Sequence, residues 1–520
     1  MANQQHQLGS SRKAGTYRTS QPATIRAFSL LSENRLEFMP DYDSLKILFS
    51  SHYSDDYIRV PAFSSNQVNC GPYCKDQHDG SRYVSLQTPV GQYDIQSIIE
   101  RLPEDQHPEL LIVKADATRG NHPINIASLQ IPKILIIGDT MHQSQPLRTM
   151  LTYVKQEKYD FHVADHVKRH LHFFHEIGIN AHWLPGALIR SWNIPFQESR
   201  NIPLSFVGQA GRFHPNRRWL LDQLKRDKFS LLETQTSQEE ACKIYAASQI
   251  TLNPSMMGDI NLRVFEVLSA GGFLITDKVS LQAGDNLIFK DDHHLVSFKD
   301  YDDLSAKITC YLDHPLEALT IARQGYDEFW TNHSPAVKRK QLLDLVFKSQ
   351  LPQLYDGRLD NRCSAFPPLT AYALQERLQQ YEYLQSIHRI VEQLKVLFLS
   401  SSNHQLLSDL VDMPRFQLFC SGPLTDALSK AGVASQIQIF HIESKLAESS
   451  EFDVAVINSN SLVSSTESAF LKQSKIKQLL VADGQTKLSD QKESQVESQL
   501  KEIGYLPLKH NGLTVYHLRA

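Results

Sequence analysis

Short apolar runs that alternate with helical patterns are the feature that most constrains how this chain of 520 residues can fold. In the N-terminal third, four runs of strand length separate amphipathic segments, at residues 45–51, 109–116, 132–139 and 159–166. A continuous apolar strand is buried on both faces, and helices between successive strands provide the cover. The pattern therefore predicts the α/β class, with parallel sheets between layers of helices.

The alternation recurs along the chain, which suggests three domains behind a polar N-terminal tail. Residues 1–41 are polar and lack the apolar core of a signal peptide, so we predict a disordered tail. Two Rossmann-like domains then follow at 42–190 and 200–350, and a third α/β domain at 373–520. Three domains fit the usual size of about 100–200 residues each.

The composition excludes several classes of protein. The net charge is -4 with interspersed charges, so nothing global favours nucleic acid or an anionic membrane as a partner. No segment approaches the roughly 20 apolar residues that span a bilayer, and six cysteines in a chain this long form no disulfide framework. Cys70 and Cys74 could be half a metal site, but no second pair follows at zinc spacing. We predict a cytoplasmic protein without a bound metal.

One stretch, residues 253–278, has the pattern of a ligand site. A strand ends at Asn253, and a helix that carries Arg263 and Glu266 in its first turns leads to Gly271-Gly272. In open α/β sheets ligands bind at the carboxyl ends of strands, and helix N-termini attract phosphate. An arginine fork suits a diphosphate, whereas a carboxylate suits the hydroxyls of a sugar. The stretch therefore predicts a nucleotide-sugar site in a cleft between the first two domains.

The same stretch resembles a known family. "LNPSMMGDINLRVFEVLSAGGFLITD" is similar to the C-terminal half of the CgeB/YkvP-like spore-protein glycosyltransferases, which have the GT-B fold. The shared pattern is a strand that ends in Asn, a variable loop, Arg-x-Phe-Glu, a helix of small residues and Gly-Gly. Upstream, "LSFVGQAGRFHPNRRWLLDQL" resembles the Phe-Val-Gly segment of the family. The resemblance extends over residues 110–350.

The resemblance implies a glycosyltransferase that moves a sugar from a nucleotide-sugar donor to a saccharide or protein hydroxyl, with no further cofactor. Arg263 and its helix N-terminus would hold the donor diphosphate, and Glu266 would bind the ribose or sugar. The other implied donor-side positions are Gly208 for backbone approach, Arg212 or Arg218 as a second cation, Asn253 at the strand end, and the Gly271-Gly272 turn.

Catalytic residues are expected in the first domain. An inverting reaction needs a general base there, and Asp139 and His142 directly follow a predicted strand. Many retaining relatives carry a second glutamate eight residues before Glu266. That position is Gly258 here, with Asp259 beside it, so the stereochemical course stays open.

Each of these signals also has a purely structural interpretation. Arg263 and Glu266 could form an exposed ion pair, Arg212, Arg217 and Arg218 a solvated loop, and Gly271-Gly272 a helix stop. Lys114 and Arg119 could lie at the cleft edge or on the surface. For the histidines of residues 162–182 a solvated helix face is favoured over a metal site. They are His162, His166, His170, His172, His175 and His182.

The third domain resembles S-adenosylmethionine-dependent methyltransferases in its strand pattern and its final hairpin. It lacks their Gly-x-Gly-x-Gly loop after the first strand, where "LSSSNHQLL" stands instead, and an acidic residue after the second. We therefore expect a degenerate methyltransferase fold that is structural or binds a protein partner. The alternatives for the whole chain are a non-catalytic GT-B-fold scaffold and, as a third hypothesis, an active methyltransferase.

Overall fold

The computed structural model of the protein describes most of the chain beyond residue 40. The described residues are 41–52, 61–165, 167–211, 214–255, 258–284, 286–357, 362–387, 393–399, 404–411, 413, 416–421, 423–440, 452–458, 465–474, 476–482, 489–511 and 513–519. The tail predicted at 1–41 thus lies, apart from its last residue, outside the described residues.

Within the described residues, the first domain is built on an eight-stranded sheet in the order β10-β9-β8-β6-β1-β2-β4-β3. All neighbours are parallel except β3 and β4. The strands are β1 (Ile47–Ser50), β2 (Gln67–Gly71), β3 (Gln77–Asp79), β4 (Arg82–Gln87), β6 (Leu110–Ala115), β8 (Lys133–Ile137), β9 (Phe161–Ala164) and β10 (Ala181–Trp183). A parallel pair, β5 (Gly91–Asp94) and β7 (Asn121–Ile124), lies beside it. The helices are α2 (Ile95–Ile99), α3 (Pro146–Gln156) and α4 (Leu171–Glu176).

The four apolar runs are confirmed as strands β1, β6, β8 and β9. Every residue of β1, β6 and β8 is buried, as continuous apolar composition requires of a strand covered on both faces. The sequence analysis did not identify β2, β3, β4, β5 and β7, which are short and carry partly exposed side chains. The helix expected after β9 is broken into a 3₁₀ turn, Lys168–His170, and the short α4.

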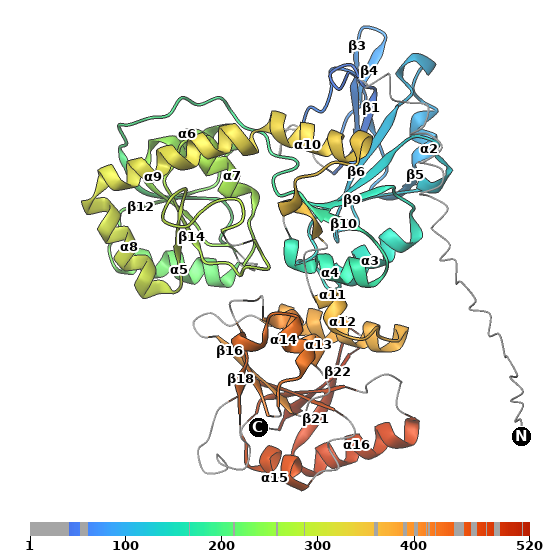
Figure 1. Ribbon diagram of the computed structural model, residues 1–520, viewed down its shortest axis with the longest axis vertical. Coiled ribbons are helices and arrows are strands. Elements are labelled where there is room, and N and C mark those ends of the chain that lie inside the picture. The colour runs from blue at the N-terminus through green and yellow to red at the C-terminus, as the bar shows by residue number, and fades with distance from the viewer. Residues whose placement is uncertain are drawn as a thin grey trace, which may run out of the picture. The chain divides into compact units, whose positions relative to one another are not determined.

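The second domain has a five-stranded, fully parallel sheet in the order β12-β11-β13-β14-β15 among the described residues. Helices α5 and α8 flank one face of this sheet, and α6 and α7 flank the other (Figure 1). The strands are β11 (Ile202–Val207), β12 (Leu231–Thr234), β13 (Ser248–Asn253), β14 (Leu274–Asp277) and β15 (Val296–Phe298). The helices are α5 (Pro215–Arg226), α6 (Gln238–Ala247), α7 (Leu262–Ser269), α8 (Tyr301–Asp313), α9 (Pro315–Glu328) and α10 (Pro335–Lys348).

The local signals in this domain act as the sequence suggests, with one exception. The Ser237 side chain caps α6 by accepting from the backbone nitrogen of Glu240, as an N-cap serine should. The sequence of residues 286–298, "NLIFKDDHHLVSF", predicts a pair of strands, and this prediction is wrong. Only β15 and an isolated bridge between Asp291 and Leu295 form there.

The third domain contains a seven-stranded sheet within its described part, in the order β18-β17-β16-β19-β20-β22-β21. Strand β22 runs antiparallel to both neighbours, and its pairing with β21 confirms the predicted final hairpin. The strands are β16 (Leu394–Leu399), β17 (Phe416–Cys420), β18 (Gln438–Ile439), β19 (Val454–Asn458), β20 (Gln478–Ala482), β21 (Tyr505–His510) and β22 (Leu513–Leu518). The helices are α11 (Arg362–Ala365), α12 (Ala371–Ser386), α13 (His404–Leu410), α14 (Asp426–Lys430), α15 (Ser465–Gln473) and α16 (Asp490–Glu502).

The predicted fold class is confirmed: two Rossmann-like domains with parallel sheets precede a third α/β domain. Residues 400–403, where a methyltransferase would need its glycine-rich loop, lie outside the described residues. Over the described chain, no helix combines the length and the apolar character needed to cross a bilayer.

Candidate active site

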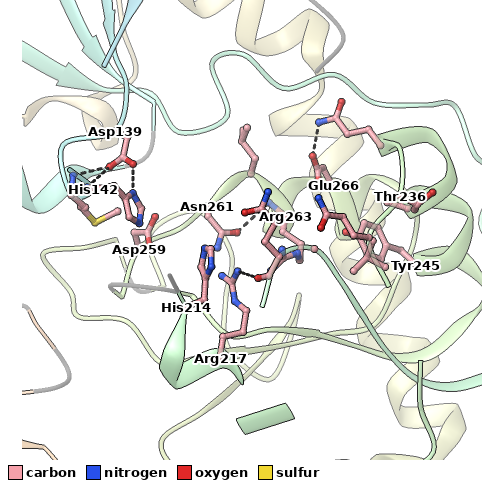
Figure 2. A pocket seen from close by; sticks show the side chains of 18 residues that line it. Asp139, His142, His214, Arg217, Thr236, Tyr245, Asp259, Asn261, Arg263 and Glu266 are labelled. Carbon is pink, nitrogen blue, oxygen red and sulfur yellow. Dashed lines mark hydrogen bonds and ion pairs between the residues drawn. The ribbon is translucent and has the colours of Figure 1, made fainter. Parts of the chain in front are cut away.

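A cavity of about 420 Å³ is lined by residues of the first and second domains. Figure 2 shows cationic and amide side chains between the Asp139–His142 pair and a second polar group that includes Glu266. The principal polar lining residues are Asp139, His142, His214, Arg217, Gln235, Thr236, Gln238, Tyr245, Asp259, Asn261, Arg263 and Glu266. A cavity of this size and polarity suits a small polar ligand.

Helix α7 presents its N-terminus to the cavity. Asn261 is the N-cap, and its side-chain oxygen accepts from the backbone nitrogen of Arg263 at 3.1 Å. The Arg263 guanidinium donates through Nη1 to Oδ1 of Asn253, the last residue of β13, at 3.0 Å. Val264 and Phe265 are buried on the core side of the helix. The strand end and the helix start together therefore fix where the guanidinium lies.

Gly208 makes this position of Arg263 possible. Its φ is +140°, and a Cβ added there would lie 2.2 Å from Nη2 of Arg263. Any larger residue would displace the guanidinium, whose Cζ also lies 4.8 Å from the centre of the Phe206 ring. The expected glycine is thus at the site, and the group that approaches it in this structure is Arg263.

Two guanidinium groups face the cavity without a carboxylate partner. Among the described residues, neither Arg217 nor Arg263 forms an ion pair. Arg217 instead donates to the backbone oxygens of Gln209 at 2.7 Å and Pro254 at 3.0 and 3.2 Å. Burial, and then the charge of Arg263, lower the pKa of Arg217 to about 10. Arg217 therefore stays charged at neutral pH, and the repulsion between the two guanidiniums favours an anion between them.

His214 lies beside these cations as a neutral imidazole. Burial, followed by the charges of Arg217, His142 and Arg263, lowers the pKa of His214 to about 4. Its buried Nδ1 atom has no hydrogen-bond partner among the described residues. An anion that offset the two guanidinium charges would raise the pKa of His214 again.

Glu266 contacts Gln238 rather than Arg263. Its Oε1 accepts from Nε2 of Gln238 at 2.7 Å, and burial raises the pKa of the Glu266 carboxyl. The interpretation of Arg263 and Glu266 as an exposed ion pair is therefore wrong. In Figure 2, Glu266 lies on the same side of the cations as Thr236 and Tyr245, so three oxygen-bearing side chains gather there.

Asp139 and His142 form a hydrogen-bonded pair in the loop that follows β8. The Asp139 Oδ1 atom accepts from the backbone nitrogens of Met141 at 2.7 Å and His142 at 3.2 Å. Its Oδ2 atom contacts Nδ1 of His142. A carboxylate on one ring nitrogen orients the imidazole and supports a proton on it, so the pair has the chemistry of a general base.

A comparison with known families identifies the central part of the chain. Residues 202–344 match the family model described as glycosyl transferase-like. This segment is similar to glycosyl transferase-like domains. It contains the α7 half of the cavity, whereas Asp139 and His142 lie outside the matched residues. No curated protein matches the chain.

Similar solved structures are distant in sequence. Sucrose-phosphate synthase from Thermosynechococcus elongatus is 13% identical with a TM-score of 0.40, over 59% of this chain and 100% of that chain. HepE from Anabaena in complex with UDP and glucose is 10% identical with a TM-score of 0.39, over 59% and 100%. A glycosyltransferase from Rickettsia africae is 9% identical with a TM-score of 0.38, over 59% and 99%.

Four expected donor-side residues do not line this cavity. Arg218 instead pairs with Glu233 and with Asp222, at 2.5 and 2.6 Å. Gly271 and Gly272 lie at the opposite end of α7, where added Cβ atoms would meet Phe196 at 2.7 Å and Val267 at 2.7 Å. They stop the helix and permit packing. Asn253 is buried and positions Arg263, and Arg212 lies outside the described residues.

The sequence analysis missed several lining residues. Arg217 lines the cavity and is 7% exposed, so the solvated-loop alternative is wrong for this residue. His214 and Tyr245 carried no local signal, because a single residue before a helix or inside one shows no spacing pattern. Asp259 was noted only as the neighbour of Gly258.

The solvated-face interpretation of the histidines is wrong for three of them. His162, His170 and His172 are buried, and His166 lies outside the described residues. Lys114 is also buried and forms an ion pair with Asp165. Both predicted positions for Lys114, at the cleft edge and on the surface, are therefore wrong.

The described residues contain no group of three or more metal-ligating side chains. Cys70, half of the possible metal pair, is buried, and burial raises the pKa of its thiol to about 12. A protonated thiol is a poor metal ligand.

Proposed function

We propose that this protein is a nucleotide-sugar-dependent glycosyltransferase of GT-B type. The observation that carries the proposal is a pair of guanidiniums, Arg217 and Arg263, that form no ion pair among the described residues and lie in the same cavity as the Asp139–His142 pair. The two arginines suit a departing diphosphate, and the Asp139–His142 pair suits an attacking hydroxyl. The glycosyl transferase-like match over residues 202–344 supports the same reaction class.

The donor diphosphate would lie between Arg217, Arg263 and the N-terminus of α7. Helix N-termini and guanidiniums both stabilise phosphate oxygens, and they do so most strongly as the bond to the sugar breaks and charge develops. For this reason we expect the reaction to require no metal ion and no cofactor besides its donor and acceptor.

Glu266 would bind hydroxyl groups of the ribose or the sugar. Gln238 holds one carboxylate oxygen at 2.7 Å, and Thr236 lies in the same part of the cavity. A carboxylate accepts hydrogen bonds from hydroxyls, whereas it would repel the diphosphate. The sugar end and the diphosphate end of the donor are thereby distinguished.

His142 would act as the general base, with Asp139 as its orienting partner. The acceptor hydroxyl gives its proton to the imidazole, and its oxygen attacks the anomeric carbon. The bond from that carbon to the diphosphate oxygen breaks, and its electron pair leaves with the nucleoside diphosphate. Attack from the face opposite the leaving group would invert the anomeric configuration. Asp139 stabilises the imidazolium that forms.

The proposal also includes a cytoplasmic location and a third domain without methyltransferase activity. Among the described residues, Cys70, Cys242 and Cys310 are free thiols, which suits a reducing cytoplasm. The strand order of the third domain and its antiparallel β22 support the methyltransferase resemblance in fold only. S-adenosylmethionine titrated against the full chain should therefore give no binding heat, and micromolar binding would favour the methyltransferase hypothesis.

Calorimetric titration with UDP, GDP and TDP tests the donor site. One nucleotide should bind at micromolar concentration, and the double variant Arg263→Ala/Glu266→Ala should lose that binding. Arg218→Ala is the matched control, because it removes a nearby arginine whose charge is already paired. If the folded wild type bound none of the three nucleotides, the result would favour the non-catalytic scaffold.

A kinetic assay tests the proposed general base. It measures the release of nucleoside diphosphate from a panel of nucleotide sugars in the presence of saccharide acceptors. Asp139→Asn should lower kcat by about 10²–10⁴, the usual contribution of a positioned base and its partner. The donor KM should change little, because Asp139 contacts His142 and the backbone of its own loop. Full activity in Asp139→Asn would remove this pair from the mechanism.

A further inference from the structure

Helix α12 of the third domain docks on the first domain through buried polar side chains. The Glu382 carboxylate accepts from the backbone nitrogen of Arg148 at 2.9 Å and from its Nε atom at 2.5 Å. Arg148 lies in the first turn of α3, so Glu382 also supplies negative charge to that helix N-terminus. Arg377 donates to Glu176 at 2.7 and 3.1 Å. Such directional contacts fix an orientation as well as an attachment.

A second contact from α12 leads to the cavity. The Tyr381 hydroxyl lies 2.8 Å from Nε2 of His170, and Nδ1 of His170 lies 2.7 Å from Oγ1 of Thr140. All three side chains are 1% exposed. Thr140 is the residue between Asp139 and Met141, which both line the cavity. The loop that carries the proposed base is therefore tied to the third domain through one imidazole.

The His170 imidazole transmits orientation because it is neutral. Burial, then the charges of Arg169, His172 and Arg362, lower the pKa of His170 well below its ordinary value. A neutral imidazole donates through one nitrogen and accepts through the other. Removing the partner of one nitrogen therefore also disturbs the bond that the other nitrogen makes.

The residue before His170 reaches the other side of the cavity. Nη1 of Arg169 donates to the backbone oxygen of Gly258 at 3.2 Å, and Gly258 precedes Asp259, which lines the cavity. The backbone oxygen of Arg169 accepts from Nδ1 of His172, whose Nε2 lies 3.0 Å from Asp409 of the third domain. The turn at residues 169–172 thus contacts the third domain and both cavity loops.

We propose that the third domain positions the two loops of the cavity, through the Tyr381–His170–Thr140 chain to Asp139 and through Arg169 to Gly258. Tyr381 is a positioning residue, since it contacts the proposed base only through other side chains. The kinetic consequence rests on the proposed glycosyl transfer, whereas the structural coupling does not. In this proposal the third domain serves as a rigid support for the cavity loops.

The substitution Tyr381→Phe tests this coupling with the loss of one oxygen atom. Tyr383→Phe is a matched control on the same helix, because the Tyr383 hydroxyl donates at 2.8 Å to Gln478 within the third domain. Hydrogen exchange followed by mass spectrometry is measured on the full chain of each variant. Tyr381→Phe should speed exchange in peptides that cover residues 139–145 by about tenfold, since their local opening becomes easier. Tyr383→Phe should leave these peptides unchanged.

The kinetic arm uses the nucleotide sugar that the wild type turns over. Tyr381→Phe should lower kcat by about tenfold or more, because misplaced reacting groups are costly. Nucleotide affinity by calorimetry and the donor KM should stay within about twofold, which a general loss of folding would not allow. Tyr383→Phe should keep wild-type kcat.

Two results would overturn the proposal. Unchanged exchange at residues 139–145 in a folded Tyr381→Phe variant would show that the chain does not hold the loop. Faster exchange with unchanged kcat would show that the loop needs no such support. A wild type that turns over no nucleotide sugar contradicts the proposed function instead, and the exchange comparison still decides the coupling.

Discussion

Arginines occupy two regions of this protein in opposite electrostatic states. At the α12 junction, Arg377 is 6% exposed and forms bidentate contacts with both Asp409 and Glu176. In the cavity, Arg217 is also buried and yet, within the part of the chain that the structure describes, donates only to backbone oxygens, and Arg263 donates to an amide. The same residue type is neutralised in one region and left with net charge in the other.

This difference in charge pairing indicates a different role for each region. A buried cation that meets two carboxylates has its charge satisfied within the protein and serves the structure. Two neighbouring cations that form no ion pair among the described residues repel each other and raise the free energy of the empty cavity, and an anionic ligand relieves that repulsion. Substitutions should therefore affect stability at the junction and ligand affinity in the cavity.

The largest effect is expected from Arg377→Met. Asp409 has no exposed side-chain surface, and burial would raise its pKa, but Arg377 outweighs this and holds the pKa below its ordinary value. Removal of Arg377 leaves that charge poorly compensated, so the free energy of unfolding should fall by about 3–5 kcal/mol. Thermal and denaturant unfolding of the full chain measure the change.

The double variant Arg377→Met/Asp409→Leu is the control for this prediction. It removes both buried charges and should recover part of the lost stability. Wild-type stability in the single variant would mean that the junction does not depend on paired charge, and the contrast with the cavity would fail.

The second largest effect is expected on ligand affinity, from a substitution that leaves the charge of the protein unchanged. Gly208→Ala should push the Arg263 guanidinium away, since the new Cβ would lie 2.2 Å from Nη2 and the φ of +140° disfavours a side chain. Nucleoside diphosphate should bind about tenfold or more weakly, by calorimetry. Gly211→Ala is the control on the same loop, because nothing lies within 4 Å of its added Cβ. Equal affinities for the two variants would contradict the placement of the diphosphate at Arg263.

The comparison also shows which parts of the molecule the sequence could predict. The start of α7 was predictable because its determinants are local: the strand end at Asn253, the cap at Asn261 and the apolar face at Val264 and Phe265. The same holds for β1, β6 and β8, whose burial follows from their own composition.

Residues whose role depends on distant partners could not be predicted. His170 and His172 meet Tyr381 and Asp409, which are 211 and 237 residues away in the chain. No local pattern reports such a contact, so an exposed helix face was the natural expectation. Arg217 and Arg218 are adjacent and chemically equal, and only the direction of each side chain from α5 decides which one meets the cavity.

A smaller effect is expected in the number of protons that the protein takes up when nucleoside diphosphate binds. The pKa of His214 in the free protein is about 4, through burial and the nearby cations, so the imidazole is neutral above about pH 5. A bound diphosphate should raise that pKa toward its ordinary value, so binding near pH 6 should take up a proton. Calorimetry in buffers with different ionisation enthalpies measures this uptake.

His214→Gln separates this proton from those of the ligand. A terminal phosphate also titrates near pH 6, so the wild type must be compared with the variant at each pH. As the pH falls from about 7 to about 5, wild-type affinity should gain relative to the variant, by at most about tenfold per pH unit for one proton. Parallel pH profiles would place the diphosphate away from His214.

The smallest effect is expected from Arg218→Ala. The Arg218 side chain is 34% exposed and pairs with Glu233, which is 20% exposed and also contacts Lys225. Exposed pairs of this kind contribute about 0–1 kcal/mol, so thermal unfolding should shift little and nucleotide affinity should stay within about twofold. Arg217→Ala, one residue away, should instead reduce nucleotide affinity severalfold, because that guanidinium faces the cavity without a carboxylate. A large loss of affinity in Arg218→Ala would mean that the second phosphate cation is the one the sequence first suggested, and that α5 turns to present it when the donor binds.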